Sequence, residues 1–367
     1  MAAASPTQVR GRFAPSPSGR MHLGNAWTAM LAWLSARSKG GAVVLRMEDL
    51  DPDRSKEHFA REILSDLAWL GLDWDEGPDK RGPYGPYRQS KRRGYYQTCL
   101  DILEEQGLLY PCWCTRGELR PPAAGVSSDR LLSAANGPAD CGEGAQTRPG
   151  NGEEQDHARI AQAPHAGEAE PPYAGTCLRL SHEARAARAA AMAGGRAPAL
   201  RLKAGTGRIS FIDKILGPCS QDLARDCGDF VLRRSDGVHA YQLAVTADDA
   251  AQCVTEVVRG ADLLESTPRQ IYLQRLFGWP QPAYAHVPLL VDPDGRRLSK
   301  RRGDVDLGLL RARGVAPGAI MGYLAWKAGL LNAPHPVSPP ELIDGFSFQP
   351  LPRGPVVVEE NWLAAGA

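Results

Sequence analysis

Apolar residues recur along the chain in two patterns, one typical of amphipathic helices and one of short buried strands. The first helical run places Trp27, Met30, Leu31 and Leu34 at positions i, i+3, i+4 and i+7. This run ends near Gly40, and the apolar residues 42–47 follow as a short strand. An extended segment, a helix and a strand in this order predict an α/β fold built on a parallel sheet.

The same patterns divide the rest of the chain. We expect helices over residues 59–70, 90–106, 184–193, 267–278 and 316–330. We expect strands over residues 200–203, 209–213, 230–233, 238–243 and 284–291, and a strand at 255–262 that runs into a helix. Asp236 and Gly237 mark a hairpin turn, which residues 241–244 would close.

Charge and composition narrow the class of protein. The 367 residues carry 43 basic and 42 acidic side chains, so any contact with nucleic acid must come from local basic patches such as residues 91–93 and 296–302. Residues 1–8 lack the pattern of a secretory signal, and no apolar run approaches membrane-spanning length. Eight Cys without an export signal favour reduced thiols or metal ligands. We therefore expect a cytoplasmic protein with no membrane partner.

The stretch from Arg12 to Asn25 carries the strongest chemical signal. It runs Arg-Phe-Ala-Pro-Ser-Pro-Ser-Gly-Arg-Met-His-Leu-Gly-Asn. Its two prolines hold the backbone extended, and Gly24 lets the chain pass close to a flat ligand because no Cβ intervenes. The next helix begins beside His22, and its free N–H groups form an anion site. Runs of Pro, Ser and Gly are usually plain turns, but the ordered ending His-Leu-Gly-Asn favours a binding loop.

Glu48 is the candidate ligand of the next segment. It follows the apolar run 42–47, so it lies at the carboxyl end of a predicted strand. Open α/β sheets bind ligands at that end of their strands, and Glu48 is therefore well placed to meet a substrate.

Residues 12–25 resemble the "HIGH" region of the class I aminoacyl-tRNA synthetases, in their glutamyl form. Those enzymes pair this region with a "KMSKS" loop far downstream, and Arg-Leu-Ser-Lys-Arg at residues 297–301 fits that loop. Two further segments are most similar to one branch, the glutamyl-Q tRNA(Asp) synthetases: Tyr-Gln-Leu-Ala at 241–244 and Thr-Glu-Val-Val-Arg-Gly-Ala-Asp-Leu-Leu at 255–264. The resemblance covers most of residues 10–330.

The resemblance implies an ATP-dependent ligase that activates L-glutamate to glutamyl-adenylate and transfers it to queuosine in the anticodon loop of tRNA(Asp). It implies that His22 and Lys300 are catalytic and, with Mg²⁺, neutralise the charge that grows on the phosphates of ATP. The implied glutamate ligands are Arg12, Phe13, Ala14, Pro15, Ser16, Glu48, Tyr241 and Arg259. The implied ATP ligands are His22, Gly24, Asn25, Ser299 and Lys300. Which arginine takes which carboxylate of glutamate stays open.

The resemblance also implies one structural zinc ion (Zn²⁺) per chain. Its ligands would be the Cys-x-Cys pair Cys112 and Cys114 together with Tyr173 and Cys177, the second half of a Cys-x-Cys…Tyr-x-x-x-Cys site. The two halves are farther apart than in the family, because an insert at 116–172 separates them. The insert is rich in Ala, Gly, Pro, Glu and Asp, and we expect it to be disordered. Water, or Cys141, His157 and His165 of the insert, are alternative ligands.

The predicted layout is a Rossmann-type catalytic domain interrupted by an inserted acceptor-binding and zinc region. Its first half would span residues 1–111, the inserted region 112–200, the second half 201–302, and a short helical C-terminal part 303–367. We expect a monomer that lacks an anticodon-binding domain. Two alternatives remain: a shortened glutamyl-tRNA synthetase that charges a tRNA 3′ end, and a non-catalytic paralogue that binds glutamate or tRNA.

Overall fold

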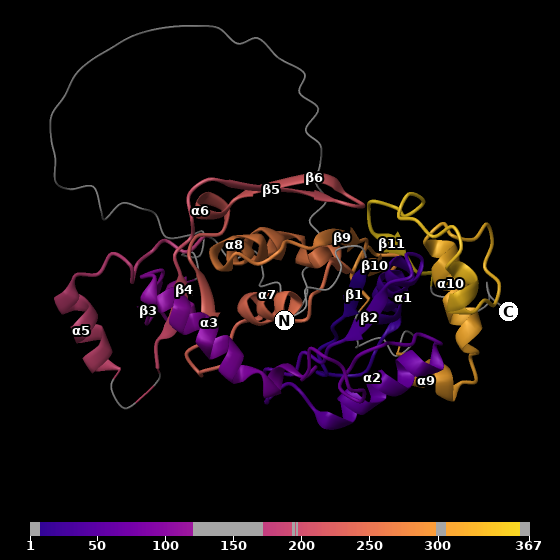
Figure 1. Ribbon diagram of the computed structural model, residues 1–367, viewed down its shortest axis with the longest axis horizontal. Coiled ribbons are helices and arrows are strands. Elements are labelled where there is room, and N and C mark those ends of the chain that lie inside the picture. The colour runs from indigo at the N-terminus through magenta and orange to yellow at the C-terminus, as the bar shows by residue number, and fades with distance from the viewer. Residues whose placement is uncertain (1–7, 120–171, 193–194, 196, 299–305, 360–367) are drawn as a thin grey trace, which may run out of the picture.

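The computed structural model describes residues 8–119, 172–192, 195, 197–298 and 306–359 (Figure 1). Five of the predicted ligands and alternative ligands lie outside the described residues: Cys141, His157, His165, Ser299 and Lys300. Among the helices that the structure describes, none has the length and apolar character needed to cross a bilayer.

A six-stranded sheet forms the centre of the molecule, in the order β2-β1-β8-β9-β5-β6 (Figure 1). Its strands are β2 (Ala42–Leu45), β1 (Arg10–Phe13), β8 (Glu256–Gly260), β9 (Ala283–Val287), β5 (Arg208–Asp213) and β6 (Gly217–Asp222). The pairs from β2 to β5 are parallel, whereas β6 is the antiparallel hairpin partner of β5. The predicted α/β fold with a parallel sheet is confirmed.

Helix α1 (Leu23–Arg37) follows the loop after β1 and is buried along most of its length. It packs with α2 (Glu57–Trp69) and α10 (Pro317–Lys327) in one apolar cluster that includes Val258 and Val287 of the central strands. Trp27 Nε1–H donates to the carbonyl of Pro288 at 2.8 Å, which satisfies the polar atom of a buried indole. This packing fixes the N-terminus of α1 against the sheet.

A second apolar cluster joins three helices to a separate antiparallel sheet in the order β3-β4-β7. The helices are α3 (Arg93–Glu105), α7 (Tyr241–Ala251) and α8 (Thr267–Phe277). The strands are β3 (Leu109–Cys112), β4 (Ala199–Leu202) and β7 (Phe230–Arg233). Helix α7 follows β7 after a turn, and it lies between β4 of the small sheet and β1 and β2 of the large one in the view of Figure 1.

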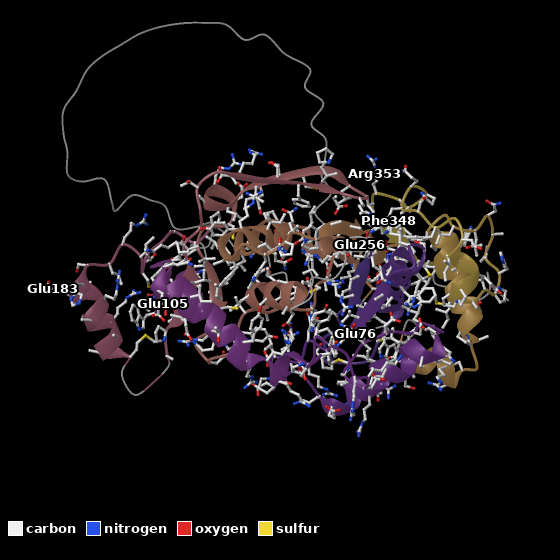
Figure 2. The ribbon with its side chains drawn as sticks, viewed as in Figure 1. Glu76, Glu105, Glu183, Glu256, Phe348 and Arg353 are labelled. Atoms are coloured by element: carbon white, nitrogen blue, oxygen red, sulfur yellow. The ribbon has the colours of Figure 1, made fainter. Side chains whose placement is uncertain are left out.

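The remaining elements are short. They are η1 (Gln89–Lys91), α4 (Arg116–Leu119), α5 (His182–Ala191), α6 (Leu223–Asp226), η2 (Ala261–Ser266), β10 (Leu290–Val291), α9 (Leu307–Ala312), η4 (Pro339–Leu342) and β11 (Val356–Val357). Helix α5 buries none of its residues, and Glu183 on it projects from one end of the molecule (Figure 2). Helices α9 and α10 lie at the opposite end, in the region that was expected to be helical (Figure 1).

The predicted strand at residues 238–243 is wrong. The turn before it is present, since Arg234 N–H donates to the Val238 carbonyl at 2.8 Å and Gly237 has a φ of 84°. Helix α7 then begins at Tyr241, and residues 242–249 are all buried. Burial on every face removes the alternation of polar and apolar positions that marks a surface helix, so the run resembles a strand in sequence.

The predicted disordered insert at 116–172 begins too early. Arg116–Leu119 forms the short helix α4, and Thr115 caps it. Thr115 N–H donates to Glu118 Oε2 at 2.7 Å, and Glu118 N–H donates to Thr115 Oγ1 at 3.3 Å. This reciprocal pair is a capping box, a local signal that composition alone does not reveal. Residues 120–171 lie outside the described part of the chain.

Candidate active site

His22 is the N-cap of α1. Its Nδ1 accepts the backbone N–H of Gly24 at 3.1 Å, and its own backbone N–H donates to Asn25 Oδ1 at 3.1 Å. A Cβ on Gly24 would lie 3.0 Å from Cε1 of the imidazole, so the close cap depends on glycine. Because Nδ1 is an acceptor here, the neutral ring carries its proton on Nε2, a donor beside the positive end of the helix dipole.

A cavity of about 220 Å³ opens at this helix end. It lies where the carboxyl ends of β1 and β8 meet, the edge at which parallel sheets bind ligands. All the predicted glutamate and ATP ligands among the described residues line it: Arg12, Phe13, Ala14, Pro15, Ser16, His22, Gly24, Asn25, Glu48, Tyr241 and Arg259. The structure therefore brings together residues from four separate segments of the sequence.

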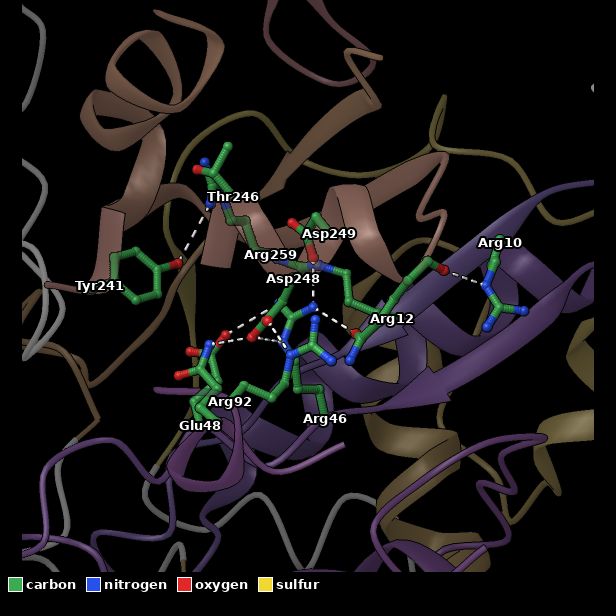
Figure 3. Close-up of polar contacts among 12 residues, drawn as sticks. Arg10, Arg12, Arg46, Glu48, Arg92, Tyr241, Thr246, Asp248, Asp249 and Arg259 are labelled. Carbon is green, nitrogen blue, oxygen red and sulfur yellow. Dashed lines mark hydrogen bonds and ion pairs between the residues drawn. The ribbon is translucent and has the colours of Figure 1, made fainter. Parts of the chain in front are cut away.

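A buried network of charges supports the cavity (Figure 3). Arg46, fully excluded from solvent, donates to Asp249 Oδ1 at 2.7 Å and to Gln252 Oε1 at 3.0 Å. Asp249 Oδ1 also lies 3.4 Å from Nε of Arg12, so Arg12 shares this carboxylate with Arg46. Buried charges that are paired in this way are costly to displace, and the network holds Arg12 in place.

Asp248 anchors the same network on its other side. Its carboxylate accepts hydrogen bonds from Arg92 Nε at 2.6 Å, from Tyr96 Oη at 2.8 Å and from Gln89 Nε2 at 2.9 Å. Three donors satisfy a carboxylate that is fully buried. Helix α7, which carries Asp248, is thereby tied to the start of α3 and to η1.

Glu48 contributes the anionic group of the cavity. Its Oε1 lies 3.3 Å from Nη2 of Arg46. Burial raises the pKa of Glu48 to about 7, although the positive charges of Arg46 and Arg12 act in the opposite direction. The carboxyl group is therefore close to its midpoint near neutral pH, and a cation that enters the cavity would favour its ionised form.

Arg259 extends from β8 and is only 3% exposed. Its Nε donates to His286 Nε2 at 3.2 Å, its Nη2 donates to Thr267 Oγ1 at 2.7 Å, and its Nη1 lies 3.5 Å from the Tyr241 hydroxyl. Among the described residues, no carboxylate forms an ion pair with this guanidinium. Arg12 and Arg259 therefore differ, because Arg12 lies within ion-pair distance of Asp249, whereas Arg259 interacts with the carboxylate of Asp262 only at longer range.

Sequence reasoning missed three charged residues that line the cavity: Arg20, Asp262 and Arg297. The Arg297 Nη1 atom lies 2.7 Å from Asp262 Oδ2, which ties the residue before the 298–301 segment to η2. Arg297 belongs to the KMSKS-like motif and could have been found there. Asp262 belongs to the family-like segment 255–264, but that segment does not reveal its contact with a residue 35 positions later.

The four predicted metal ligands also converge. The sulfurs of Cys112, Cys114 and Cys177 lie within 4.8 Å of one another, and those of Cys114 and Cys177 are 3.5 Å apart. The Tyr173 hydroxyl lies 3.5 Å from both Cys112 Sγ and Cys114 Sγ. Tetrahedral zinc with bonds of about 2.3 Å holds sulfurs roughly 3.8 Å apart, so this spacing suits one ion. The cluster can therefore hold a metal.

A larger groove of about 1710 Å³ runs between the cysteine cluster and the cavity. Cys114 and Tyr173 line one end of it, and Tyr241 lines both the groove and the cavity. Its charged lining residues are Arg54, Arg201, Arg234, Arg269, Asp51, Glu118, Asp226, Asp229, Asp236 and Glu265. Six carboxylates and four arginines thus line the groove.

Comparison with known proteins places this chain among tRNA synthetases. A family model described as "tRNA synthetases class I (E and Q), catalytic domain" matches residues 8–125 and 149–330. A glutamyl-Q tRNA(Asp) synthetase from Symbiobacterium thermophilum is 46% identical over 356 residues, which are 97% of both chains. Another, from Nitratidesulfovibrio vulgaris, is 47% identical over 97% of both chains.

Longer relatives match as well. The glutamate–tRNA ligase 2 of Acidithiobacillus ferrooxidans is 39% identical over 95% of this chain, which spans 64% of that ligase. The crystal structure of the glutamate-tRNA synthetase from Elizabethkingia anophelis has a TM-score of 0.73 at 26% identity, and the match covers 97% of this chain and 69% of that one. The fold of this chain is thus that of the longer enzymes over the shared part.

Proposed function

Because the chain belongs to the glutamyl-Q tRNA(Asp) synthetase family of class I tRNA synthetases, we propose that it activates L-glutamate with ATP and transfers it to queuosine in the anticodon loop of tRNA(Asp). One observation carries the proposal. Arg12, Arg259 and Glu48 meet in one cavity beside the α1 N-terminus that His22 caps. The cavity thus combines cations, an anion and an anion-binding helix end.

The charges of the cavity match those of glutamate. The substrate has two carboxylates and one ammonium group, so it needs two cationic or strong donor groups and one anion. Arg12 and Arg259 supply the cations, and Ser16 and Tyr241 add hydroxyl groups. Glu48 supplies the anion. Because Arg259 alone of the two arginines lacks a carboxylate partner among the described residues, it gains most from a bound carboxylate.

In the first step, a carboxylate oxygen of glutamate attacks the α-phosphorus of ATP, and pyrophosphate leaves. ATP enters as its Mg²⁺ complex. The α1 N-terminus and His22 Nε2–H stabilise negative charge that develops on the phosphates, and Gly24 allows the nucleotide to approach the backbone. Ser299 and Lys300, outside the described residues, complete the ATP site in this proposal. Lys300 suits the role because its ammonium group is a point charge on a flexible stem.

In the second step, a hydroxyl of the queuosine cyclopentenediol attacks the carbonyl carbon of glutamyl-adenylate. An ester bond forms, the bond between the carbonyl carbon and the phosphate oxygen breaks, and AMP leaves with the bonding electrons while its phosphate takes up the hydroxyl proton. The large groove meets the cavity at Tyr241 and therefore offers a route for the anticodon loop. Electrostatic positioning by buried groups, rather than a covalent enzyme intermediate, supports both steps.

We propose that Cys112, Cys114, Tyr173 and Cys177 hold one zinc ion with a structural role. Three sulfurs and a hydroxyl at tetrahedral spacing fit that ion. Burial opposes ionisation of Cys177, but hydrogen bonds from Trp113 N–H and from neighbouring side chains lower the pKa of its thiol to about 7. A thiolate is the form that binds zinc. The ion would join the two segments of the chain that flank the 116–172 insert.

The enzyme would act as a monomer in the cytoplasm, where ATP and tRNA are found. Two alternative functions predict different results. A glutamyl-tRNA synthetase would need the tRNA 3′ end, and a non-catalytic paralogue would form no adenylate. The test is to incubate the protein with ATP and labelled glutamate in the presence of three RNAs: tRNA(Asp) with queuosine, the same tRNA without queuosine, and queuosine-containing tRNA(Asp) trimmed at its 3′ end. Labelling of the first and third, but not the second, supports the proposal; labelling that needs the 3′ end contradicts it.

A further inference from the structure

Arg259 and His286 are paired across neighbouring parallel strands. The register of β8 and β9 places the two residues side by side, and Nε of Arg259 lies 3.2 Å from Nε2 of His286. His286 is fully buried, whereas Arg259 lines the cavity. The imidazole therefore contacts the guanidinium at Nε, while Nη1 faces the hydroxyl of Tyr241, another residue that lines the cavity.

Asp213 fixes the other edge of the same imidazole. Its Oδ2 lies 2.7 Å from His286 Nδ1 and 3.1 Å from the His286 backbone nitrogen. Its Oδ1 accepts the N–H groups of Ile215 and Leu216, each at 2.9 Å. Burial works against ionisation of Asp213, but His286 and these N–H groups together lower its pKa. Asp213 is thus an anion that can only accept hydrogen bonds.

These partners leave one protonation state for His286. The Asp213 carboxylate requires a proton on Nδ1, and the Arg259 Nε–H requires a lone pair on Nε2. A doubly protonated ring would direct N–H at N–H. Burial lowers the pKa of His286 to about 4, which agrees with the neutral ring. Thr267 fits the same pattern, because its Oγ1 accepts from Arg259 Nη2 at 2.7 Å and can donate to His286 Nε2 at 3.0 Å.

The groups that hold Arg259 are neutral, whereas the group that faces Arg12 is charged. Arg12 faces Asp249 at 3.4 Å, so part of its charge is cancelled within the protein. Arg259 is held by an imidazole and a hydroxyl, which accept its N–H groups without cancelling its charge. A buried guanidinium oriented by neutral acceptors keeps its attraction for an incoming carboxylate.

We propose that His286 is a positioning residue for glutamate recognition: held by Asp213 with its proton on Nδ1, it orients Arg259 toward a carboxylate of the substrate without itself cancelling the charge of Arg259. The inference rests on the proposed function, in which Arg259 binds glutamate. It adds Asp213, His286 and Thr267 as a buried chain of groups behind the binding arginine.

Two substitutions of His286 test the contacts of its two ring nitrogens separately. In His286→Gln, the side-chain oxygen can reach the position of Nε2 and accept from Arg259. In His286→Asn, the shorter amide can still donate to Asp213 but cannot reach Arg259. Tyr284→Phe is the matched control, since it removes a buried hydroxyl of the same strand that bonds to Gln274 at 3.0 Å and not to Arg259. Thermal unfolding of all three variants would show that each one is folded.

We expect His286→Asn to raise KM for glutamate in ATP–pyrophosphate exchange by at least about tenfold, the loss of one hydrogen bond to a charged group. KM for ATP should change by less than about twofold, and His286→Gln should recover most of the affinity for glutamate. Tyr284→Phe should leave both KM values unchanged. Equal changes in the two KM values of His286→Asn, or equal effects of the Asn and Gln variants, would overturn the proposal.

A second measurement does not depend on activity. The ¹⁵N chemical shifts of the His286 ring in the intact protein should show a protonated Nδ1 and an unprotonated Nε2 between pH 6 and 8; the opposite tautomer would also overturn the inference. The variant Arg259→Ala distinguishes a failure of the inference about His286 from a failure of the proposed function. If Arg259→Ala leaves KM for glutamate unchanged, the proposed glutamate site is wrong; if it raises KM but His286→Asn does not, only the inference about His286 fails.

Discussion

Glu48 Oε1 lies 3.3 Å from Arg46 Nη2, but Arg46 is shared, because its Nη1 binds Asp249 Oδ1 at the shorter distance of 2.7 Å. Its Nε also lies 3.7 Å from Asp248 Oδ2, so one buried guanidinium is divided among three carboxylates. Asp249 takes the closer contact, and burial raises the pKa of Glu48 to about 7. This arrangement keeps Glu48 in the protein interior while leaving its charge sensitive to what enters the cavity.

Affinity for glutamate should fall as the pH drops below about 7. A raised pKa means that Glu48 is ionised above pH 7 and neutral below it, and only the ionised form pairs with the substrate ammonium group. KM for glutamate should rise by up to about tenfold per pH unit well below the pKa. The measurement is KM for glutamate in pyrophosphate exchange from pH 5.5 to 8.5. Glu48→Gln should give a high KM with no such dependence, and a flat profile in the unmodified enzyme would refute the role of Glu48.

Removing the Arg259 side chain should impair the use of glutamate far more than that of ATP. Truncating one partner of a buried, hydrogen-bonded charge pair costs about 2–5 kcal/mol, so KM for glutamate in Arg259→Ala should rise by at least about 30-fold. Arg37→Ala is a suitable control, because Arg37 forms ion pairs with Asp73 and Asp75 at the far end of α1. An Arg259→Ala enzyme whose KM rises for ATP and not for glutamate would show that the pocket is assigned wrongly.

Activation of glutamate should not require tRNA. The cavity is built by β1, α1, β8 and α7 of this chain, and buried ion pairs such as Arg46–Asp249 hold it in shape. We therefore expect ATP–pyrophosphate exchange with glutamate alone, at a rate that added tRNA changes little. Exchange that appears only when tRNA is present would mean that RNA contacts order the site, contrary to this account.

The cysteine cluster should bind about one equivalent of zinc per chain, as structural sites with four protein ligands do. Cys177→Ser should lower the zinc content measured by metal analysis, because it removes one of three converging sulfurs. Adenylate formation should persist, since none of the four cluster residues lines the small cavity that holds Arg12, Glu48 and Arg259. Tyr173→Phe tests whether the phenol is a ligand or whether water replaces it. Freshly reduced protein without zinc would rule out the metal site and leave the enzyme assignment intact.

The parts of the fold that depend on local patterns could be predicted from the sequence. Strand β7 was expected at Phe230–Arg233 and lies there, and α8 begins at Thr267 as expected. The helix ends at Gly278, which has a φ of 65°. Helix α7 was missed because residues 242–249 are all buried in the folded chain, so the helix has no polar face that would mark it in the sequence. The order of the central strands likewise depends on long-range pairing that no local window contains.

The candidate site likewise has parts that the sequence could predict and parts that it could not. The loop from Arg12 to Asn25 and the cysteine pair are continuous in sequence, so a family motif could identify them. The support behind Arg259 is not continuous, because Asp213 and His286 are 73 residues apart and meet only through the pairing of neighbouring strands. A histidine in an apolar strand looks like an ordinary core residue until its two partners are known.

The position of the transferred glutamate tests the central claim most directly. Queuosine-containing tRNA(Asp) incubated with the enzyme, ATP and glutamate should be digested to nucleosides under mildly acidic conditions and analysed by mass spectrometry. The account predicts that queuosine nucleoside gains the mass of one esterified glutamate while the 3′-terminal adenosine does not. Glutamate on the terminal adenosine, or none on any nucleoside despite active pyrophosphate exchange, would contradict it.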